Sequence, residues 1–142
     1  MDNLRDSRLS SSYWALRVTF IAVPILAGLD KFTNLLTNWT HYLSPAFARL
    51  IPLAPSTFMR VVGIVEIVVG LLVALKVTRV GAYLAMVWLV CIAVNLASMG
   101  LYDIAVRDLG LAVGAFALAR LDAVRAGVPE HARAHRTATA TT

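Results

Sequence analysis

Long apolar segments alternate with short polar ones along the chain. The apolar segments cover residues 13–31, 57–77, 80–99 and 103–121. A helix of about 20 apolar residues spans the hydrocarbon core of a bilayer. The third segment has no polar stripe of the kind that amphipathic helices of soluble proteins show. The period-two alternation of membrane β-barrel strands is also missing. The pattern therefore predicts an all-α integral membrane protein, a four-helix bundle whose segments each cross the bilayer.

The connection between the first two segments, residues 32–56, is long and carries aromatic side chains. Trp39 and Tyr42 are of the type that anchors a chain at the membrane–water interface. Ser44, followed by a proline, predicts the start of a short interfacial helix over residues 45–51. Two interpretations stay open for this outer loop. Either it lies on the membrane surface as a lid with no binding site beneath it, or it covers a site between the outer helix ends.

The remaining connections and the two ends of the chain are polar. The four residues 76–79 are too few for anything but a tight turn, which predicts an antiparallel hairpin. Residues 1–12 read as a cytoplasmic lead, in which the three serines at 10–12 can cap the first helix. Residues 122–142 read as a cytoplasmic, disordered tail. Residues 13–121 then form a single membrane domain.

Composition and charge support a membrane protein and indicate its orientation. Hydrophobic residues make up 59% of the chain and charged residues 15%, whereas soluble domains carry about 25% charged residues. Nine of the 13 Lys and Arg residues lie in the lead, near the start of the first segment, in the 76–79 turn or after the fourth segment. Basic residues concentrate on the cytoplasmic side of membrane proteins. The pattern therefore predicts a plasma-membrane protein with both termini in the cytoplasm. It also explains the net charge of +5 without binding to nucleic acid.

Polar residues within or beside the apolar segments are the candidate functional residues. An ionisable side chain at bilayer depth costs about 3 kcal/mol, so it usually faces the bundle interior and has a partner. In the predicted orientation most of them lie in the outer half, below the 32–56 loop, with Glu66 deepest. The candidate cluster consists of Arg17, Asp30, Lys31, Arg60, Glu66, Asn95, Asp103, Arg107 and Asp108.

Two interpretations of this cluster stay open. In the first it is a structural network, in which Arg107 pairs with Asp103 or Glu66 and Arg17 extends to the inner headgroups. In the second it is a polar pocket that binds a quinone head or another small molecule, or relays protons. The sequence does not choose between them.

Metal and haem sites are not expected on this chain. No histidine lies inside an apolar segment, where a membrane cytochrome takes its axial ligands. His131 and His135 have a helical i, i+4 spacing but no third ligand near them. Cys91 has no second cysteine to pair with and is expected to be a small buried filler. No phosphate loop, HExxH motif or serine nucleophile elbow is present, so no catalytic residue is predicted.

Two stretches of the sequence resemble the DoxX family of small four-span membrane proteins. Arg17 and the run GLDKF at residues 28–32 resemble the family's first span, with an early arginine and a Gly-x-x-Lys-Leu/Phe exit. The run VGIVEIVVGLL at residues 62–72, which contains Glu66, resembles its second span. The resemblance extends over roughly residues 13–121. It implies that Arg17, Lys31 and Glu66 correspond to the family's characteristic residues. The chain departs from the family in its long aromatic outer loop and in the aspartate before Lys31.

The resemblance implies a place in membrane redox chemistry. DoxX-like proteins are linked to membrane oxidoreductases, among them quinone-reactive complexes and a complex that handles oxidative stress with soluble redox partners. The first hypothesis is thus a non-catalytic accessory subunit of a membrane oxidoreductase, with no cofactor on this chain. The second is a quinone- or small-molecule-binding protein that uses Glu66, Arg107 and Asp108. The third is a small oligomeric transporter. The bilayer, a partner protein or a second copy are the expected partners.

Overall fold

The computed structural model describes residues 2–126, and within that range every regular element is a helix. The tail residues 127–142, with His131 and His135, lie outside the described residues. The prediction of an all-α protein is confirmed for the part that is described. The elements are α1 (Asp2–Thr33), the 3-10 helix η1 (Trp39–Tyr42), α2 (Pro45–Leu50), α3 (Pro55–Ala74), α4 (Thr78–Ala97) and α5 (Tyr102–Ala126).

Three of these helices are long and apolar enough to cross a membrane. They are the Leu9–Thr33 part of α1, all of α3 and all of α4. The 25-residue α5 is longer than α3 or α4, but Arg107, Asp108 and Arg120 interrupt its apolar sequence. The structure thus confirms a membrane-type helical protein with several apolar helices.

Both ends of the membrane domain are more helical than the sequence pattern predicts. Helix α1 begins at Asp2, so the serines at 10–12 lie inside it and do not cap its start. Residues 2–12 contain no glycine or proline that would interrupt a helix. Helix α5 continues past residue 121 to Ala126. Contacts with α1 stabilise this extension, because the Tyr13 hydroxyl donates to Asp122 Oδ1 at 2.9 Å. The Arg125 guanidinium also lies 4.4 Å from the centre of the Tyr13 ring.

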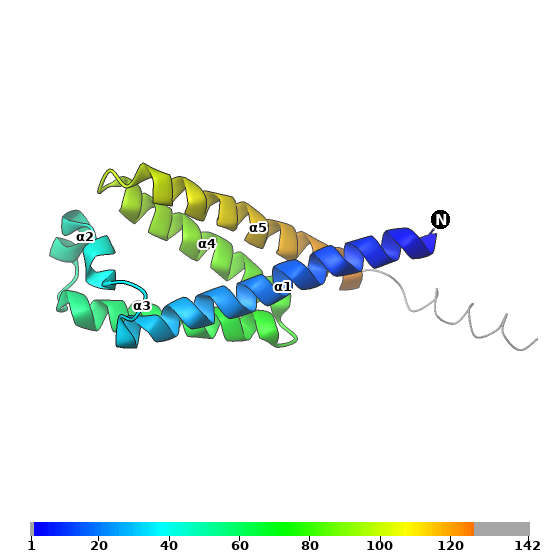
Figure 1. The fold of residues 1–142 in the computed structure, drawn as a ribbon, viewed down its shortest axis with the longest axis horizontal. Coiled ribbons are helices and arrows are strands. Elements are labelled where there is room, and N and C mark those ends of the chain that lie inside the picture. The colour runs from blue at the N-terminus through cyan, green and yellow to red at the C-terminus, as the bar shows by residue number, and fades with distance from the viewer. Residues whose placement is uncertain (1, 127–142) are drawn as a thin grey trace, which may run out of the picture.

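The four long helices form two antiparallel pairs that diverge from one end of the molecule to the other. Helix α1 packs along α3, and α4 packs along α5 (Figure 1). Glycines allow the first pair to approach closely. A Cβ on Gly28 would lie 2.5 Å from the Gly63 carbonyl oxygen, and one on Gly63 would lie 2.6 Å from the Gly28 carbonyl oxygen. The two pairs meet near the α3–α4 turn and separate toward the end where η1 and α2 lie.

The hydrophobic core lies at the converging end. Its members come from all four long helices: Tyr13, Phe20, Val69, Val73, Ala82, Ala85, Ala115, Leu118 and Ala119. Arg17 closes this end by donating to the carbonyl oxygens of Val73 (3.2 Å), Ala74 (2.9 Å) and Leu75 (3.2 Å). The last carbonyl groups of a helix have no intrahelical donor, so Arg17 holds the end of α3 against α1.

The segment between α1 and α3 folds back over the diverging end. Ser44 caps α2 by accepting a hydrogen bond from Ala46 N, and the following proline occupies the first turn. The short helix predicted at residues 45–51 is confirmed as α2. The chain reverses at Asn34, which has a φ of 51°. This segment is therefore a folded cap on the wide end of the molecule.

Candidate functional site

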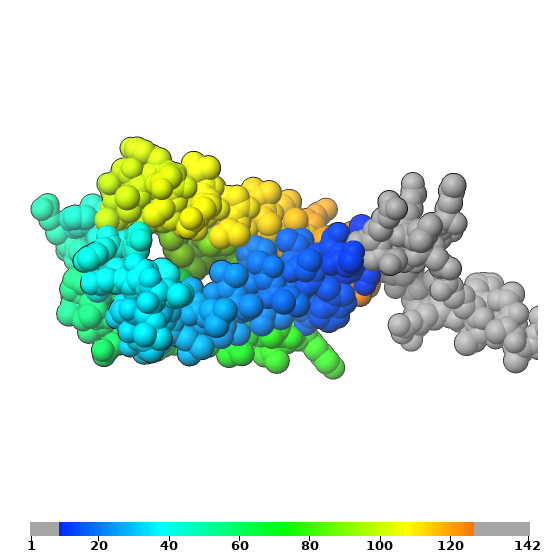
Figure 2. Space-filling view, viewed as in Figure 1, coloured from blue at the N-terminus to red at the C-terminus, as the bar shows by residue number. Residues whose placement is uncertain are grey.

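A large cavity fills the space where the two helix pairs diverge. Its volume is about 590 Å³, and its lining comes from all four long helices and from the segment that contains η1. Figure 2 shows a hollow between α1 and α5, beside the segment that follows α1. Apolar side chains such as Phe20, Met59, Val62 and Leu89 make up most of the wall. Cavities of roughly 300–1,000 Å³ with apolar walls and a few polar groups are typical small-molecule sites.

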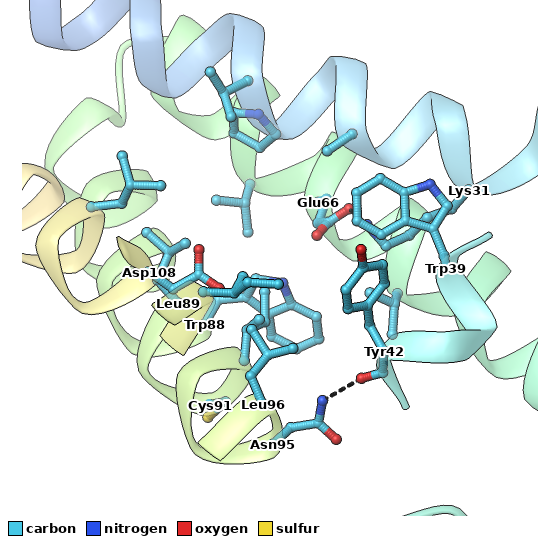
Figure 3. A pocket seen from close by; sticks show the side chains of 18 of the residues that line it. Lys31, Trp39, Tyr42, Glu66, Trp88, Leu89, Cys91, Asn95, Leu96 and Asp108 are labelled. Carbon is cyan, nitrogen blue, oxygen red and sulfur yellow. Dashed lines mark hydrogen bonds and ion pairs between the residues drawn. The ribbon is translucent and has the colours of Figure 1, made fainter. Parts of the chain in front are cut away.

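A buried ion pair lies on the α1–α3 side of this cavity. Lys31 Nζ lies 2.6 Å from Glu66 Oε2, and the two side chains are only 4% and 9% exposed. Lys31 comes from the last turn of α1 and Glu66 from the middle of α3. The ring of Trp39 covers the ammonium group, with Nζ 3.6 Å from the ring centre (Figure 3). The lysine charge is thus compensated both by a carboxylate and by an aromatic face.

The α4–α5 side carries a different set of polar groups. Trp88 of α4 and Asp108 of α5 both line the cavity. The indole Nε1 of Trp88 is buried, and within the described residues it has no hydrogen-bond partner. In Figure 3 this nitrogen faces the space between Glu66 and Asp108. Asp108 is half-buried and forms no ion pair with any described residue. This side therefore offers a donor and an acceptor to whatever enters the cavity.

Two hydrogen-bond networks hold the segment with η1 in place over the wide end. On the α1 side, Asp30 accepts from the indole Nε1 of Trp39 at 2.7 Å and from the backbone amides of Leu35 (2.9 Å) and Leu36 (3.1 Å). This carboxylate is buried, and its acceptor sites are used by the loop. Asp30 is therefore a residue that positions the loop.

On the α4 side, Asn95 makes the equivalent attachment. Its Nδ2 donates to the Tyr42 carbonyl oxygen at 2.6 Å, and its Oδ1 accepts from Ser44 N at 3.0 Å. The hydroxyl groups of Ser44 and Ser98 are also hydrogen-bonded, at 2.9 Å. Because Trp39 and Tyr42 line the cavity from this segment, the loop forms part of the cavity wall.

The structure brings together only part of the predicted polar cluster. Lys31, Glu66, Asn95, Arg107 and Asp108 line the cavity, and Asp30 lies beside it. Arg17 lies at the converging end, while Arg60 and Asp103 are exposed and are not among the lining residues.

The pairing expected under the structural-network interpretation of the cluster is wrong in two respects. Glu66 pairs with Lys31 and not with Arg107, because the close α1–α3 contact at Gly28 brings the end of α1 beside the middle of α3. The Arg107 side chain is exposed and forms no ion pair with a described residue. Arg17 was expected to extend to headgroups, but it turns inward onto the end of α3.

Sequence reasoning missed the most informative residue of the cavity. Trp88 lies near the middle of an apolar helix, whereas membrane tryptophans are enriched at the two interfaces. That unusual depth was the signal that could have identified it. Cys91 was expected to be buried, but it is exposed and contributes to the cavity lining. Among the residues that the structure describes, no group of three His, Cys, Asp or Glu side chains could hold a metal ion.

Comparisons with known proteins identify the family. A family model described as DoxX matches residues 13–98. The matched range includes Arg17, Lys31, Glu66 and Trp88 and ends before α5. No curated protein and no solved structure matches the chain.

Proposed function

This chain belongs to the DoxX family and is a small membrane protein, and from that premise we propose that it binds a lipophilic molecule of the quinone class. The cavity of about 590 Å³ between the helix pairs is the observation that carries this proposal. Apolar walls suit a flat ring and the start of a hydrocarbon tail, while the few polar groups suit the oxygen atoms of the ring. The hollow between α1 and α5 faces sideways, which is the direction from which a membrane-dissolved molecule arrives.

The proposal includes a topology. We propose that α5 is a fourth span and that both termini lie in the cytoplasm at the plasma membrane. The support is the packing of α5 along α4 and the placement of basic residues. Arg17, Lys76, Arg79 and Arg125 all belong to the converging end, as the positive-inside pattern expects for the cytoplasmic side.

Thiol labelling from outside intact cells tests this topology. Cys91→Ala provides a background without cysteine, on which Val77→Cys and Tyr102→Cys are made one at a time. Val77 and Tyr102 are 44% and 66% exposed and lie at opposite ends of α4. A membrane-impermeant maleimide should label Cys only at position 102. Labelling at position 77 alone would reverse the proposed orientation.

The binding proposal is tested by purifying the protein from its native membrane in mild detergent and measuring bound lipophilic molecules by mass spectrometry. Ala27 lines the cavity from α1 and is half-buried, so Ala27→Phe should fill the cavity and remove the ligand. Val18→Phe is the matched control, because Val18 lies on the same helix, is 57% exposed and does not line the cavity. A quinone retained by the wild type and Val18→Phe but lost from Ala27→Phe supports the proposal. Equal retention by all three proteins, or none by the wild type, contradicts it.

We also propose that the protein acts as an accessory subunit of a membrane oxidoreductase and is not an enzyme by itself. Two observations support this proposal. The chain belongs to a family whose members are linked to membrane oxidoreductases, and its cavity opens to the side, where it could share its occupant with a neighbouring protein. The same purification, followed by protein identification, should recover an oxidoreductase in stoichiometric amount. Purification free of any partner but with bound quinone would restrict the function to ligand binding. Recovery of neither would favour the small oligomeric transporter.

A further inference from the structure

The indole N–H of Trp88 stands out among the polar groups of this protein. It is the buried side-chain nitrogen or oxygen for which the described residues provide no hydrogen-bond partner. Buried donors are satisfied in most proteins, since an unmet donor loses the bonds that it made with water. Trp88 lines the cavity, and its nitrogen faces the cavity interior in Figure 3. The missing acceptor would therefore be supplied from inside the cavity.

The protein groups near this nitrogen do not take that role. The Glu66 carboxylate is close to it and attracts the N–H group, but the contact falls outside hydrogen-bond geometry. Glu66 Oε2 instead bonds Lys31 at 2.6 Å. Asp108 lies on the other side of the same space without bonding the indole. An oxygen atom of an occupant, placed between these two side chains, would meet the N–H group.

We propose that Trp88 Nε1 donates a hydrogen bond to a carbonyl oxygen of the cavity's occupant and so determines its chemical class. An indole nitrogen can only donate, so the occupant must present an acceptor. The carboxylates of Glu66 and Asp108 lie on either side of this nitrogen, so they disfavour an anionic acceptor beside it and favour a neutral one such as a ring carbonyl. The rings of Trp88, Trp39 and Tyr42 on the cavity wall favour a flat occupant. This inference rests on the proposed function, because it names the contact by which the cavity would recognise a quinone.

Paired probes and a conservative substitution test the inference. The probes are a benzoquinone with a decyl tail and an alkylbenzene with the same ring substitution and tail but no carbonyl. Trp88→Phe removes the N–H and keeps an aromatic ring, and Trp14→Phe is the control because Trp14 is 49% exposed and does not line the cavity. The full-length protein in mild detergent is titrated with each probe. Trp88→Phe should weaken the quinone about fivefold, the ratio that matches one neutral hydrogen bond, and leave the alkylbenzene unchanged.

The possible outcomes separate this inference from the proposed function. If the wild type binds neither probe, both are overturned. If the wild type binds the quinone and Trp88→Phe binds it equally well, only the role of Trp88 is overturned. If Trp88→Phe weakens both probes to the same extent, the ring matters by packing and the hydrogen bond is again overturned.

Nuclear magnetic resonance gives a second readout on the wild-type protein, which does not depend on the variant folding. The chain has three tryptophans, so ¹⁵N labelling yields three indole N–H signals that single replacements assign. Adding the quinone should move the Trp88 proton downfield, as formation of a hydrogen bond does, and leave Trp14 in place. A Trp88 signal that stays unchanged at saturating quinone overturns the inference.

Discussion

The buried pair of Lys31 and Glu66 allows a quantitative prediction about stability. The perturbation is a double-mutant cycle of Lys31→Met, Glu66→Leu and the two substitutions together. At an effective dielectric constant of about 20, unit charges 2.6 Å apart attract each other by roughly 6 kcal/mol. Burying each ion costs several kcal/mol, so the pair as a whole contributes little to net stability. A single substitution, however, leaves the other charge buried without a partner.

We therefore expect each single variant to lose about 3–5 kcal/mol of unfolding free energy and the double variant to lose less than about 1 kcal/mol. For a chain of this size, 1 kcal/mol changes the melting temperature by roughly 3 °C. Each single variant should then melt about 9–15 °C below the wild type, and the double variant should melt close to the wild type. Loss of the Trp39 contact to the ammonium adds to the effect of Lys31→Met.

Thermal unfolding in mild detergent, followed by tryptophan fluorescence and by the fraction that stays monodisperse after heating, measures these differences. Arg60→Met is the matched control, because Arg60 is an exposed cation on the same helix as Glu66, and its melting temperature should not change. Losses in the two single variants that simply add in the double variant would refute the reasoning, since the expected losses imply a coupling energy of about 5 kcal/mol or more.

Three further predictions concern helix packing and the loop. Gly28→Ala should lower the melting temperature by several degrees, because its Cβ would lie 2.5 Å from the Gly63 carbonyl oxygen. Gly110→Ala should leave the melting temperature unchanged, because nothing lies within 4 Å of its Cβ. Equal melting temperatures of the two variants would contradict this prediction. Asp30→Asn should raise the rate of amide hydrogen exchange about tenfold in the residues between α1 and α2, because the carboxylate accepts hydrogen bonds from two backbone amides and an indole there. An unchanged exchange rate would argue against the role of Asp30 in holding the loop. Asn95→Ala should raise exchange around the start of α2 alone, because only that side of the loop is attached to α4; a rise along the whole of α4 would instead indicate global loosening.

The sequence was a good guide wherever one local property decides the structure. Runs of about 20 apolar residues predicted α3 and α4 almost to their ends, because a hydrophobic stretch of that length is a helix in lipid. The Ser-Pro start of α2 was also predictable, since Ser44 needs only the backbone two residues ahead to form its cap. The run of residues 28–32 together with Glu66 pointed to the family that the comparison identifies.

The sequence was a poor guide to which charges meet. Glu66 could pair with any cation at a similar depth, and the choice of Lys31 depends on the glycine contact that brings α1 against α3. Arg107 was an equally reasonable partner by depth and sign, but it extends from α5, on the far side of the divergence. The end of α5 depends likewise on Tyr13, more than 100 residues away.

Only the tertiary structure determines that a cavity exists. Hydrophobicity determined that this chain consists of apolar helices in a membrane, because the transfer of each segment depends on its own composition. Whether the two helix pairs lie parallel or diverge depends on side chains that meet across the bundle, such as Tyr13, which bonds Asp122 of α5, and Asn95, which bonds the loop after α1. Their divergence opens the space into which Trp88 presents its unsatisfied N–H, and no property of the helix that carries Trp88 encodes that space.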